Sequence, residues 1–241
     1  MDYVYIVIIV LLIGYIMYQH IYVMPRLIKK GADDMFEFFL SGAWQMRVDW
    51  FKTLNKYVEK NTTVLVGDSL TNEYLVTEML PDKNICNRGI GGDTSDGVLK
   101  RMNESVFALN PKQMFLLIGA NDLQLTENTN EEIVSNIAKI CKLAKQHRKD
   151  MVINCVSISP VSEEVLEHVD KNTVGKRANK RIRDINELIK QLTQKNDYNY
   201  IDLYYFLANE NGSLRGEYTR EGLHFSQLAY EKITEELRKL V

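Results

Sequence analysis

The chain has 241 residues, 45% of them hydrophobic and 26% charged, which is enough apolar material for one sizeable core and an appendage. Its formal net charge of -2 argues against a dedicated nucleic-acid binder, because such proteins use a basic excess to displace counterions from phosphates. The cysteines form no close pair in the sequence, so neither a disulfide framework nor a zinc knuckle is indicated. Buried free thiols are expected at Cys86, Cys141 and Cys155.

The chain begins with a predicted membrane anchor over residues 1–25. Residues 3–24 are almost wholly apolar, and about 20 such residues span a bilayer as a helix. A cleavable signal peptide is the alternative, but no basic region precedes the apolar run and no small-x-small cleavage site follows it closely. We therefore expect a single-pass helix in the cell membrane. Arg26, Lys29 and Lys30 favour a cytoplasmic domain, although the tail before the span is too short to decide the side.

Residues 26–60 are predicted to form a juxtamembrane segment and an amphipathic helix that leads into a single domain over residues 61–241. Apolar residues recur there at near-helical spacing, at Met46, Val48, Trp50, Phe51, Leu54, Tyr57 and Val58. An interfacial membrane helix is the alternative, but Asp49 and Glu59 among the lysines favour packing on the core of the domain.

The first strand of the domain is expected at residues 64–66, an apolar run that breaks at Gly-Asp-Ser-Leu, residues 67–70. Ser69 would then stand at the carboxyl end of a strand, where open α/β sheets place ligands and chemistry. By itself the tetrapeptide is equally typical of an ordinary strand-to-helix turn with an N-cap. A helix-compatible segment follows it through Leu80.

A second apolar run, residues 85–87, leads into a glycine-rich segment over residues 88–94. Glycines at 89, 91 and 92 indicate a backbone that bends sharply or lets another group approach its N–H groups closely. A nucleotide-phosphate loop is the alternative. The glycines miss the dinucleotide pattern, because Thr94 stands where glycine or alanine is required, and no Gly-Lys-Ser/Thr follows.

The rest of the domain alternates strands with helices. A strand over residues 113–118 ends at Gly-Ala-Asn-Asp, residues 119–122, which is again a polar cluster at a strand's carboxyl end. The later expected elements are helices over residues 131–147, 163–169, 176–194 and 226–241 and strands over residues 151–158 and 200–203. This alternation predicts an α/β domain with a parallel sheet covered on both faces.

Three strand ends thus offer a serine, a glycine-rich backbone and an asparagine amide, and a late loop offers Glu221 three residues before His224. Acyl transfer needs a nucleophilic hydroxyl, an imidazole that takes its proton, a carboxylate that orients the imidazole, and donors aimed at the developing oxyanion. Every part that this chemistry requires is present.

The chain order and these local sequences resemble the SGNH, or GDSL, family of serine esterases, in particular the branch similar to platelet-activating-factor acetylhydrolase and lysophospholipase-like enzymes. The resemblance covers roughly residues 63–241, and it rests on residues 67–70, 87–94, 119–122 and 222–224 in the family's order. It implies a three-layer, flavodoxin-like fold with a central parallel sheet.

The resemblance also implies roles for single residues. Ser69 would be the nucleophile and His224 the general base, and the oxyanion donors would be the backbone N–H groups of Ser69 and Gly92 and the side-chain amide of Asn121. The family has aspartate three residues before the histidine, whereas this chain has Glu221, with the same charge and one more methylene. Glu221 is expected as the third member, and the alternative is a Ser-His dyad whose imidazole is held by a backbone carbonyl.

No metal and no cofactor are expected. The other histidines, His20, His147 and His168, have no carboxylate partners at ligand spacing. The expected function is that of a membrane-tethered serine hydrolase that cleaves a small acyl ester through an acyl-enzyme on Ser69.

Two ester classes fit that function: O-acetyl groups on a carbohydrate or cell-envelope polymer, and acyl groups of lysophospholipids. The sequence has no long apolar stretch beyond the anchor that could form a lid or an acyl tunnel, which favours short acyl groups. An O-acyltransferase acting at the same site, a non-catalytic membrane-anchored binding module and a phosphate-binding protein are the alternatives.

Overall fold

The computed structural model describes residues 11–241. The chain divides into two compact units, Met1–Gln45 and Met46–Val241. In the first unit, residues 11–18 are helical, η1 (Gln19–Val23) is a π-helical turn, and α2 (Met24–Leu54) continues past the end of the unit. Pro25 accounts for the wider turn, because proline has no N–H and its ring displaces the carbonyl four residues earlier.

The helix runs without a break through the predicted boundary between the anchor and the juxtamembrane segment. No helix within residues 11–241 is long and apolar enough to cross a membrane. The predicted anchor over residues 1–25 thus gains no support from the described residues, and its first part, residues 1–10, lies outside them.

The second unit begins with the last turns of α2. Val48 and Phe51 are buried there, and the Phe51 ring faces the guanidinium groups of Arg88, at 4.9 Å, and Arg101, at 5.9 Å. The amphipathic prediction was too broad, since four of the seven apolar residues expected to pack on the core are exposed. These are Met46, Trp50, Leu54 and Tyr57. The helix is followed by η2 (Asn55–Tyr57).

Five parallel strands form the central sheet, in the order β2-β1-β3-β4-β5, which is the flavodoxin-like order. They are β1 (Thr63–Gly67), β2 (Ile85–Gly89), β3 (Gln113–Leu117), β4 (Val152–Val156) and β5 (Asn199–Ile201). Gly67 pairs with Gly89 on one side and with Leu117 on the other, so the three strands end at the same edge. The predicted parallel α/β sheet is confirmed.

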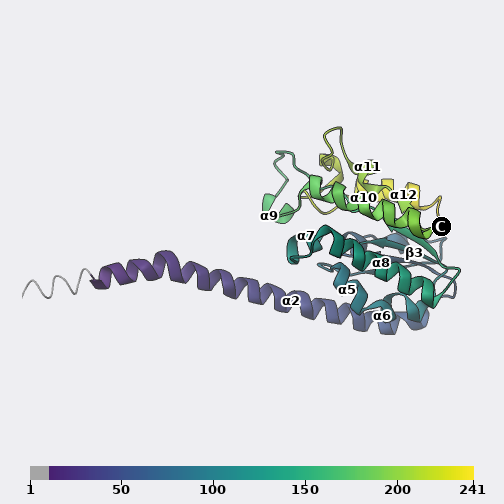
Figure 1. The fold of residues 1–241 in the computed structure, drawn as a ribbon, viewed down its shortest axis with the longest axis horizontal. Coiled ribbons are helices and arrows are strands. Elements are labelled where there is room, and N and C mark those ends of the chain that lie inside the picture. Colours follow the sequence, from purple (N-terminus) through teal and green to yellow (C-terminus); the bar gives the residue numbers. More distant parts are fainter. Residues whose placement is uncertain (1–10) are drawn as a thin grey trace, which may run out of the picture. The chain divides into compact units, whose positions relative to one another are not determined.

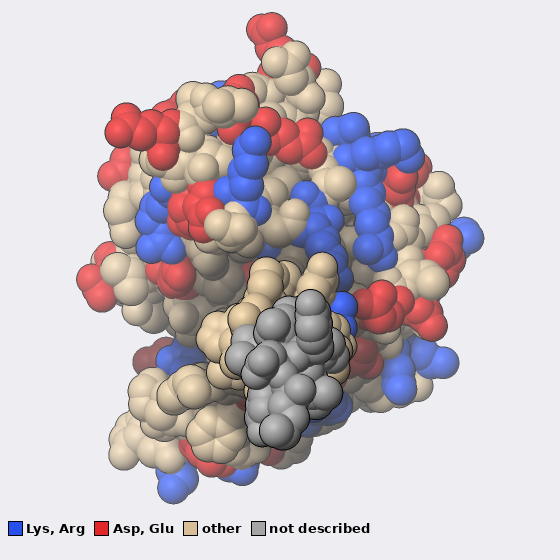
Figure 2. Space-filling model, turned by 90° about the vertical axis from the view of Figure 1, so that its left-hand side faces the viewer, with Lys and Arg blue, Asp and Glu red and all other residues tan. Residues whose placement is uncertain are grey.

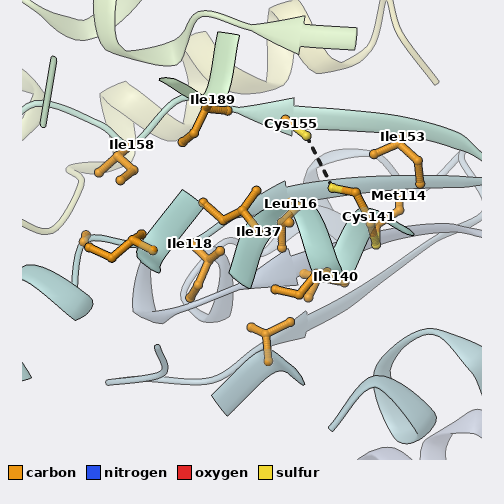
Figure 3. Close-up of a cluster of buried hydrophobic side chains, with 14 of the residues drawn as sticks. Met114, Leu116, Ile118, Ile137, Ile140, Cys141, Ile153, Cys155, Ile158 and Ile189 are labelled. Atoms are coloured by element: carbon orange, nitrogen blue, oxygen red, sulfur yellow. Dashed lines mark hydrogen bonds between the residues drawn. The ribbon is translucent and has the colours of Figure 1, made fainter. Parts of the chain in front are cut away.

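Alternate residues of each strand feed two separate cores. Val64 and Val66 point into the larger core, whereas Leu65 between them joins the other one. The larger core lies against α5 (Ser95–Lys100), α6 (Met102–Ser105), η3 (Phe107–Leu109), α8 (Asn130–His147) and α10 (Asn179–Asn196). Helices α8 and α10 lie side by side (Figure 1). In Figure 3, Cys141 and Cys155 meet inside this core with their sulfur atoms 3.6 Å apart.

The second core lies on the opposite face of the sheet, under α3 (Ser69–Asn72), α4 (Val76–Met79), α11 (Leu203–Leu207) and α12 (Gln227–Leu237). Three shorter helical segments complete the unit, namely α7 (Asp122–Leu125), α9 (Lys171–Val174) and η4 (Gly216–Tyr218). Basic and acidic side chains are interspersed on the face of the molecule drawn in Figure 2, in keeping with the small net charge.

Two predicted helices differ from the structure. The segment expected to be helical through Leu80 is split into α3 and α4, because the side-chain amide of Asn87 binds the carbonyls of Thr71 and Tyr74 between them. Residues 163–169 are not helical. The helix begins later, as α9, because Asp170 caps it through the backbone N–H groups of Asn172 and Thr173.

Candidate active site

Ser69 is the first residue of α3, directly after β1. The buried side chain of Asp68 caps the helix by accepting a hydrogen bond of 3.0 Å from the backbone N–H of Leu70. Gly67 allows the tight junction, since a β-carbon there would overlap the side chain of Thr71 and the carbonyl of Leu117. Ser69 itself is partly exposed, so its hydroxyl is not sealed inside the core.

His224 lies on a narrow loop whose ends are held together by the bridge between Thr219 and Phe225. Its Nε2 atom is 3.0 Å from Ser69 Oγ, and its Nδ1 atom is 2.6 Å from Glu221 Oε1. The carboxylate accepts from Nδ1–H, which leaves Nε2 as the acceptor for the serine hydroxyl. Residues separated by 155 positions thus form a hydrogen-bonded series of hydroxyl, imidazole and carboxylate.

Glu221 reaches the imidazole despite its extra methylene. Its Oε1 atom also accepts the backbone N–H of His224 at 2.8 Å, which folds the side chain back over its own loop. The loop is fixed from outside by two further bonds, from Ser162 N–H to the carbonyl of Gly222 and from Asp170 N–H to the carbonyl of Glu221. The partner of Nδ1 is therefore a carboxylate and not the backbone carbonyl of the dyad alternative.

The glycine-rich segment follows β2 and bends back toward β1. Gly92 has φ near +75°, a conformation that glycine adopts at little cost. The next residue, Asp93, forms an ion pair of 2.7 Å with Arg101, and both side chains are fully buried. Arg101 also donates to the carbonyls of Gly67 and Arg88, so one guanidinium ties this loop to β1 and β2.

Asn121 lies at the exit of β3 and is buried. Its Nδ2 atom donates to the carbonyl of Asp93 at 3.0 Å and makes no second hydrogen bond within residues 11–241. An amide nitrogen carries two hydrogens, so one N–H of Asn121 has no acceptor among residues 11–241. The bond to Asp93 joins the strand-end loops that carry Gly92 and Asn121.

Burial raises the pKa of two carboxyl groups near the site. It raises the pKa of Asp68 to about 7, against the opposing effect of the Leu70 N–H and of Arg177. Burial also raises the pKa of Asp122, which accepts hydrogen bonds from Ser95 N–H and, at 2.5 Å, from Ser95 Oγ. The Asp122 carboxyl group ties the start of α5 to α7, and within residues 11–241 neither carboxyl group is hydrogen-bonded to the Ser69 hydroxyl.

One buried residue of the site was missed in the sequence. Arg177 falls within the helix predicted over residues 176–194 and was given no part in the site, but its side chain is buried and donates to Asn121 Oδ1 at 2.7 Å. It lies two residues before α10 begins, outside the helical pattern on which that prediction relied.

An apolar cavity of about 380 Å³ was also not expected. It lies on the α12 face of the sheet and is lined by residues such as Leu65, Phe115, Leu117 and Tyr230. Leu70 and Phe225, which follow Ser69 and His224 in the chain, form part of its wall, whereas Ser69 and His224 do not line it. The cavity thus extends to the chain neighbours of Ser69 and His224 but not to these two residues themselves.

The remaining histidines have other surroundings. His147 stacks on Phe107, and His168 lies 3.2 Å from the carbonyl of Gly216. Within residues 11–241, no three His, Cys, Asp or Glu side chains are grouped so that they could hold a metal ion.

A parallel α/β sheet that carries a hydrogen-bonded series of serine, histidine and carboxylate is an arrangement found among serine hydrolases. Residues 65–232 match the GDSL-like Lipase/Acylhydrolase family, and the chain belongs to that family.

Solved structures show the same fold. A protein of Streptococcus pneumonia named for platelet activating factor superposes with a TM-score of 0.81 and 25% identity, over 88% of this chain and 98% of that one. A GDSL-like lipase from Bacteroides thetaiotaomicron gives a TM-score of 0.71 at 22% identity, over 80% of this chain and 96% of that one. An acetyl xylan esterase superposes with a TM-score of 0.60 at 20% identity, over 74% of this chain and 99% of that one.

Curated relatives carry a different name. An N-acylneuraminate cytidylyltransferase of Escherichia coli is 23% identical over 239 residues, which are 93% of this chain and 54% of the relative. Its namesake in Streptococcus agalactiae is 26% identical over 178 residues, 74% of this chain and 38% of the relative. The chain thus spans about half or less of the length of these curated relatives.

Proposed function

We propose that this chain hydrolyses short acyl esters, foremost O-acetyl groups on a carbohydrate, through an acyl-enzyme on Ser69. The observation that carries the proposal is the hydrogen-bonded series from Ser69 Oγ through His224 to Glu221. Such a series activates a hydroxyl that is a weak nucleophile on its own.

In the proposed reaction, Ser69 Oγ attacks the ester carbonyl carbon while His224 Nε2 takes the hydroxyl proton. Glu221 stabilises the imidazolium that forms. The oxyanion accepts hydrogen bonds from the N–H groups of Ser69 and Gly92 and from Asn121 Nδ2. His224 then protonates the leaving alcohol, and water attacks the acyl-enzyme with His224 as the base. The products are the free alcohol, the carboxylic acid and Ser69 with its hydroxyl restored.

Two observations support a short acyl group on a sugar. Neither Ser69 nor His224 lines the apolar cavity, whose wall includes Leu70 and Phe225, and this favours a short acyl group over a long chain that would need an apolar channel at the serine. The neighbour named acetyl xylan esterase and the relatives named for N-acylneuraminate are, by name, proteins that act on sugars. The cavity itself favours the second candidate, a lysophospholipid, whose acyl chain could enter it if Leu70 and Phe225 moved aside.

Hydrolysis of a chromogenic acetate ester by the full chain tests the reaction, with Ser69→Ala as the control. We expect Ser69→Ala to lose essentially all of the activity, and equal rates for the two proteins would refute the esterase. A second series compares acetyl, butyryl, octanoyl and lysophospholipid esters with O-acetylated xylan and O-acetylated N-acylneuraminate. A preference for long acyl chains would favour the lipid candidate, and transfer of the acyl group to a sugar hydroxyl would identify an acyltransferase.

We further propose that the amino-terminal apolar stretch, residues 3–24, tethers the enzyme to a membrane. The proposal is supported by the apolar composition of that stretch and by the exposure of its described apolar side chains, among them Leu11, Ile13 and Ile21. Full-length protein should then stay with membranes during alkaline carbonate extraction, while residues 46–241 alone should be released. Release of both proteins would refute the tether.

A further inference from the structure

Arg177 is a buried cation behind the candidate oxyanion donor Asn121. Its guanidinium makes four hydrogen bonds. Nε donates to the carbonyl of Ala120 at 2.9 Å, one terminal nitrogen donates to the carbonyls of Thr173 and Val174, and the other donates to Asn121 Oδ1 at 2.7 Å. Within residues 11–241, all four acceptors are neutral amide oxygens.

This arrangement is costly as a purely structural device. Burial of a cation loses its hydration, and no carboxylate of residues 11–241 lies within hydrogen-bond distance to compensate. Burial accordingly lowers the pKa of Arg177, opposed by the charge of Asp68. An apolar side chain of the same length would avoid the desolvation of a cation, but it would leave these acceptor oxygens without their donor. A buried charge without a charged partner is expected mainly at functional sites, where the function offsets its cost in stability.

The bond to Asn121 decides how its amide is turned. Arginine can only donate and a backbone carbonyl can only accept, so Oδ1 must face Arg177 and Nδ2 must face the carbonyl of Asp93. A flipped amide would lose both bonds and bring like partial charges together at each end. The cationic donor also polarises the amide, which makes its N–H groups stronger donors.

We propose that Arg177 is a positioning residue that holds Asn121 with an N–H aimed at the oxyanion and strengthens that N–H as a donor. The inference rests on the proposed function, because it assigns Arg177 a part in the same reaction. Arg177 lies on the segment between α9 and α10, so the residue that holds the oxyanion donor is far from Asn121 in the sequence.

A merely structural role is the competing explanation, since Arg177 also joins the end of α9 to the exit of β3. A double-mutant cycle separates the two roles. The variants are Arg177→Met, Asn121→Ala and the double variant, and kcat and KM are measured per active site titrated with a fluorophosphonate. Arg181→Met is the matched control, because Arg181 also holds a loop through neutral oxygens, those of Asn128 and Asn130.

We expect Arg177→Met to lower kcat about 10-fold or more with little change in KM, since the lost interaction acts on the transition state. The double variant should have almost the same kcat as Asn121→Ala alone, because Arg177 acts through the amide that Asn121→Ala already lacks. Arg177→Lys should recover part of the rate, since it keeps the charge but not the planar fork. Arg181→Met should leave kcat unchanged.

Losses in kcat that multiply fully in the double variant would overturn the inference while leaving the esterase intact. A second readout does not depend on activity. The side-chain amide resonances of Asn121, assigned in nitrogen-15-labelled protein with Asn121→Ala, should shift in Arg177→Met and shift less in Arg177→Lys. Unchanged resonances would overturn the inference whether or not the wild-type protein hydrolyses esters through Ser69. The failure of the inference can therefore be told apart from a failure of the proposed function.

Discussion

One carboxylate oxygen of Glu221 accepts two hydrogen bonds from His224. Oε1 accepts both the Nδ1–H and the backbone N–H of His224, so the longer side chain curls within its loop and still meets the ring. The other oxygen faces Arg220 at 3.8 Å, and Arg220 is itself paired with Glu73. A glutamate in place of the family's aspartate is therefore accommodated by the local fold of the loop.

Replacing Glu221 by glutamine tests whether its charge contributes to the reaction. Glu221→Gln keeps the length of the side chain and removes the charge that stabilises the imidazolium, so we expect kcat to fall by about 10²- to 10⁴-fold. The measurement is ester hydrolysis per titrated active site. Glu221→Asp is the control that keeps the charge, and it should lose less. A rate for Glu221→Gln close to wild type would favour the Ser-His dyad.

The two neighbouring glycines of the loop offer a matched pair of substitutions. Gly92 has a positive φ, so Gly92→Ala should destabilise the fold by about 1–2 kcal/mol and disturb the N–H expected to face the oxyanion. A β-carbon at Gly91 would meet no atom within 4 Å. Gly91→Ala should therefore be nearly neutral in urea unfolding and in kcat. Equal effects of the two substitutions would contradict this account of the loop.

At the level of elements, the junction of β1 and α3 depends on a buried acid. Asp68 caps the helix, and its pKa is raised to about 7 by burial, whereas an unfolded aspartate titrates near about 4. Between these values the folded chain holds a proton that the unfolded chain has lost. The stabilising contribution of this proton is complete below about pH 4 and is lost as the pH rises through about 7.

Asp68→Asn removes this titration and keeps a capping side chain. Relative to wild type, the variant should therefore gain stability as the pH rises, by about 1 kcal/mol or more between about pH 4 and about pH 8. Urea unfolding of both proteins at the two pH values measures the difference. A stability difference that does not change with pH would show that Asp68 ionises normally in the folded chain.

Strands were predicted closely and helices less so, for a physical reason. An apolar run such as residues 64–66 is buried on both sides wherever it lies in the sheet, so its pattern needs no knowledge of its neighbours. The end of α3 depends on Asn87, which lies on another strand and captures the carbonyls of Thr71 and Tyr74. Such an interaction leaves no periodic signal in the sequence.

For the molecule as a whole, both hydrophobic cores lie within residues 46–241. The alternation of strands and helices predicted this α/β domain, and the family resemblance carried by four motifs implied that Ser69 and His224 meet. The support by Arg177 and the cavity beneath Leu70 arise only from tertiary packing. The sequence shows neither, because the residues involved come from segments that meet only in the folded chain.

Truncation tests the independence of the second unit. A chain of residues 46–241 should keep the melting temperature of the domain and its rate of ester hydrolysis, because no core residue is removed. Its control is Phe51→Ala in the same chain, which should cost about 3–5 kcal/mol because Phe51 is fully buried. A large drop in melting temperature on truncation alone would contradict the division of the chain.

The central claim is that Ser69 is the nucleophile of this domain. Labelling the folded chain with a fluorophosphonate probe, followed by mass spectrometry of the modified peptide, tests it most directly. The account predicts a single adduct on Ser69 that is abolished in Ser69→Ala and slowed in His224→Ala. An adduct on another residue, or a folded wild-type protein that stays unlabelled at Ser69, would contradict it.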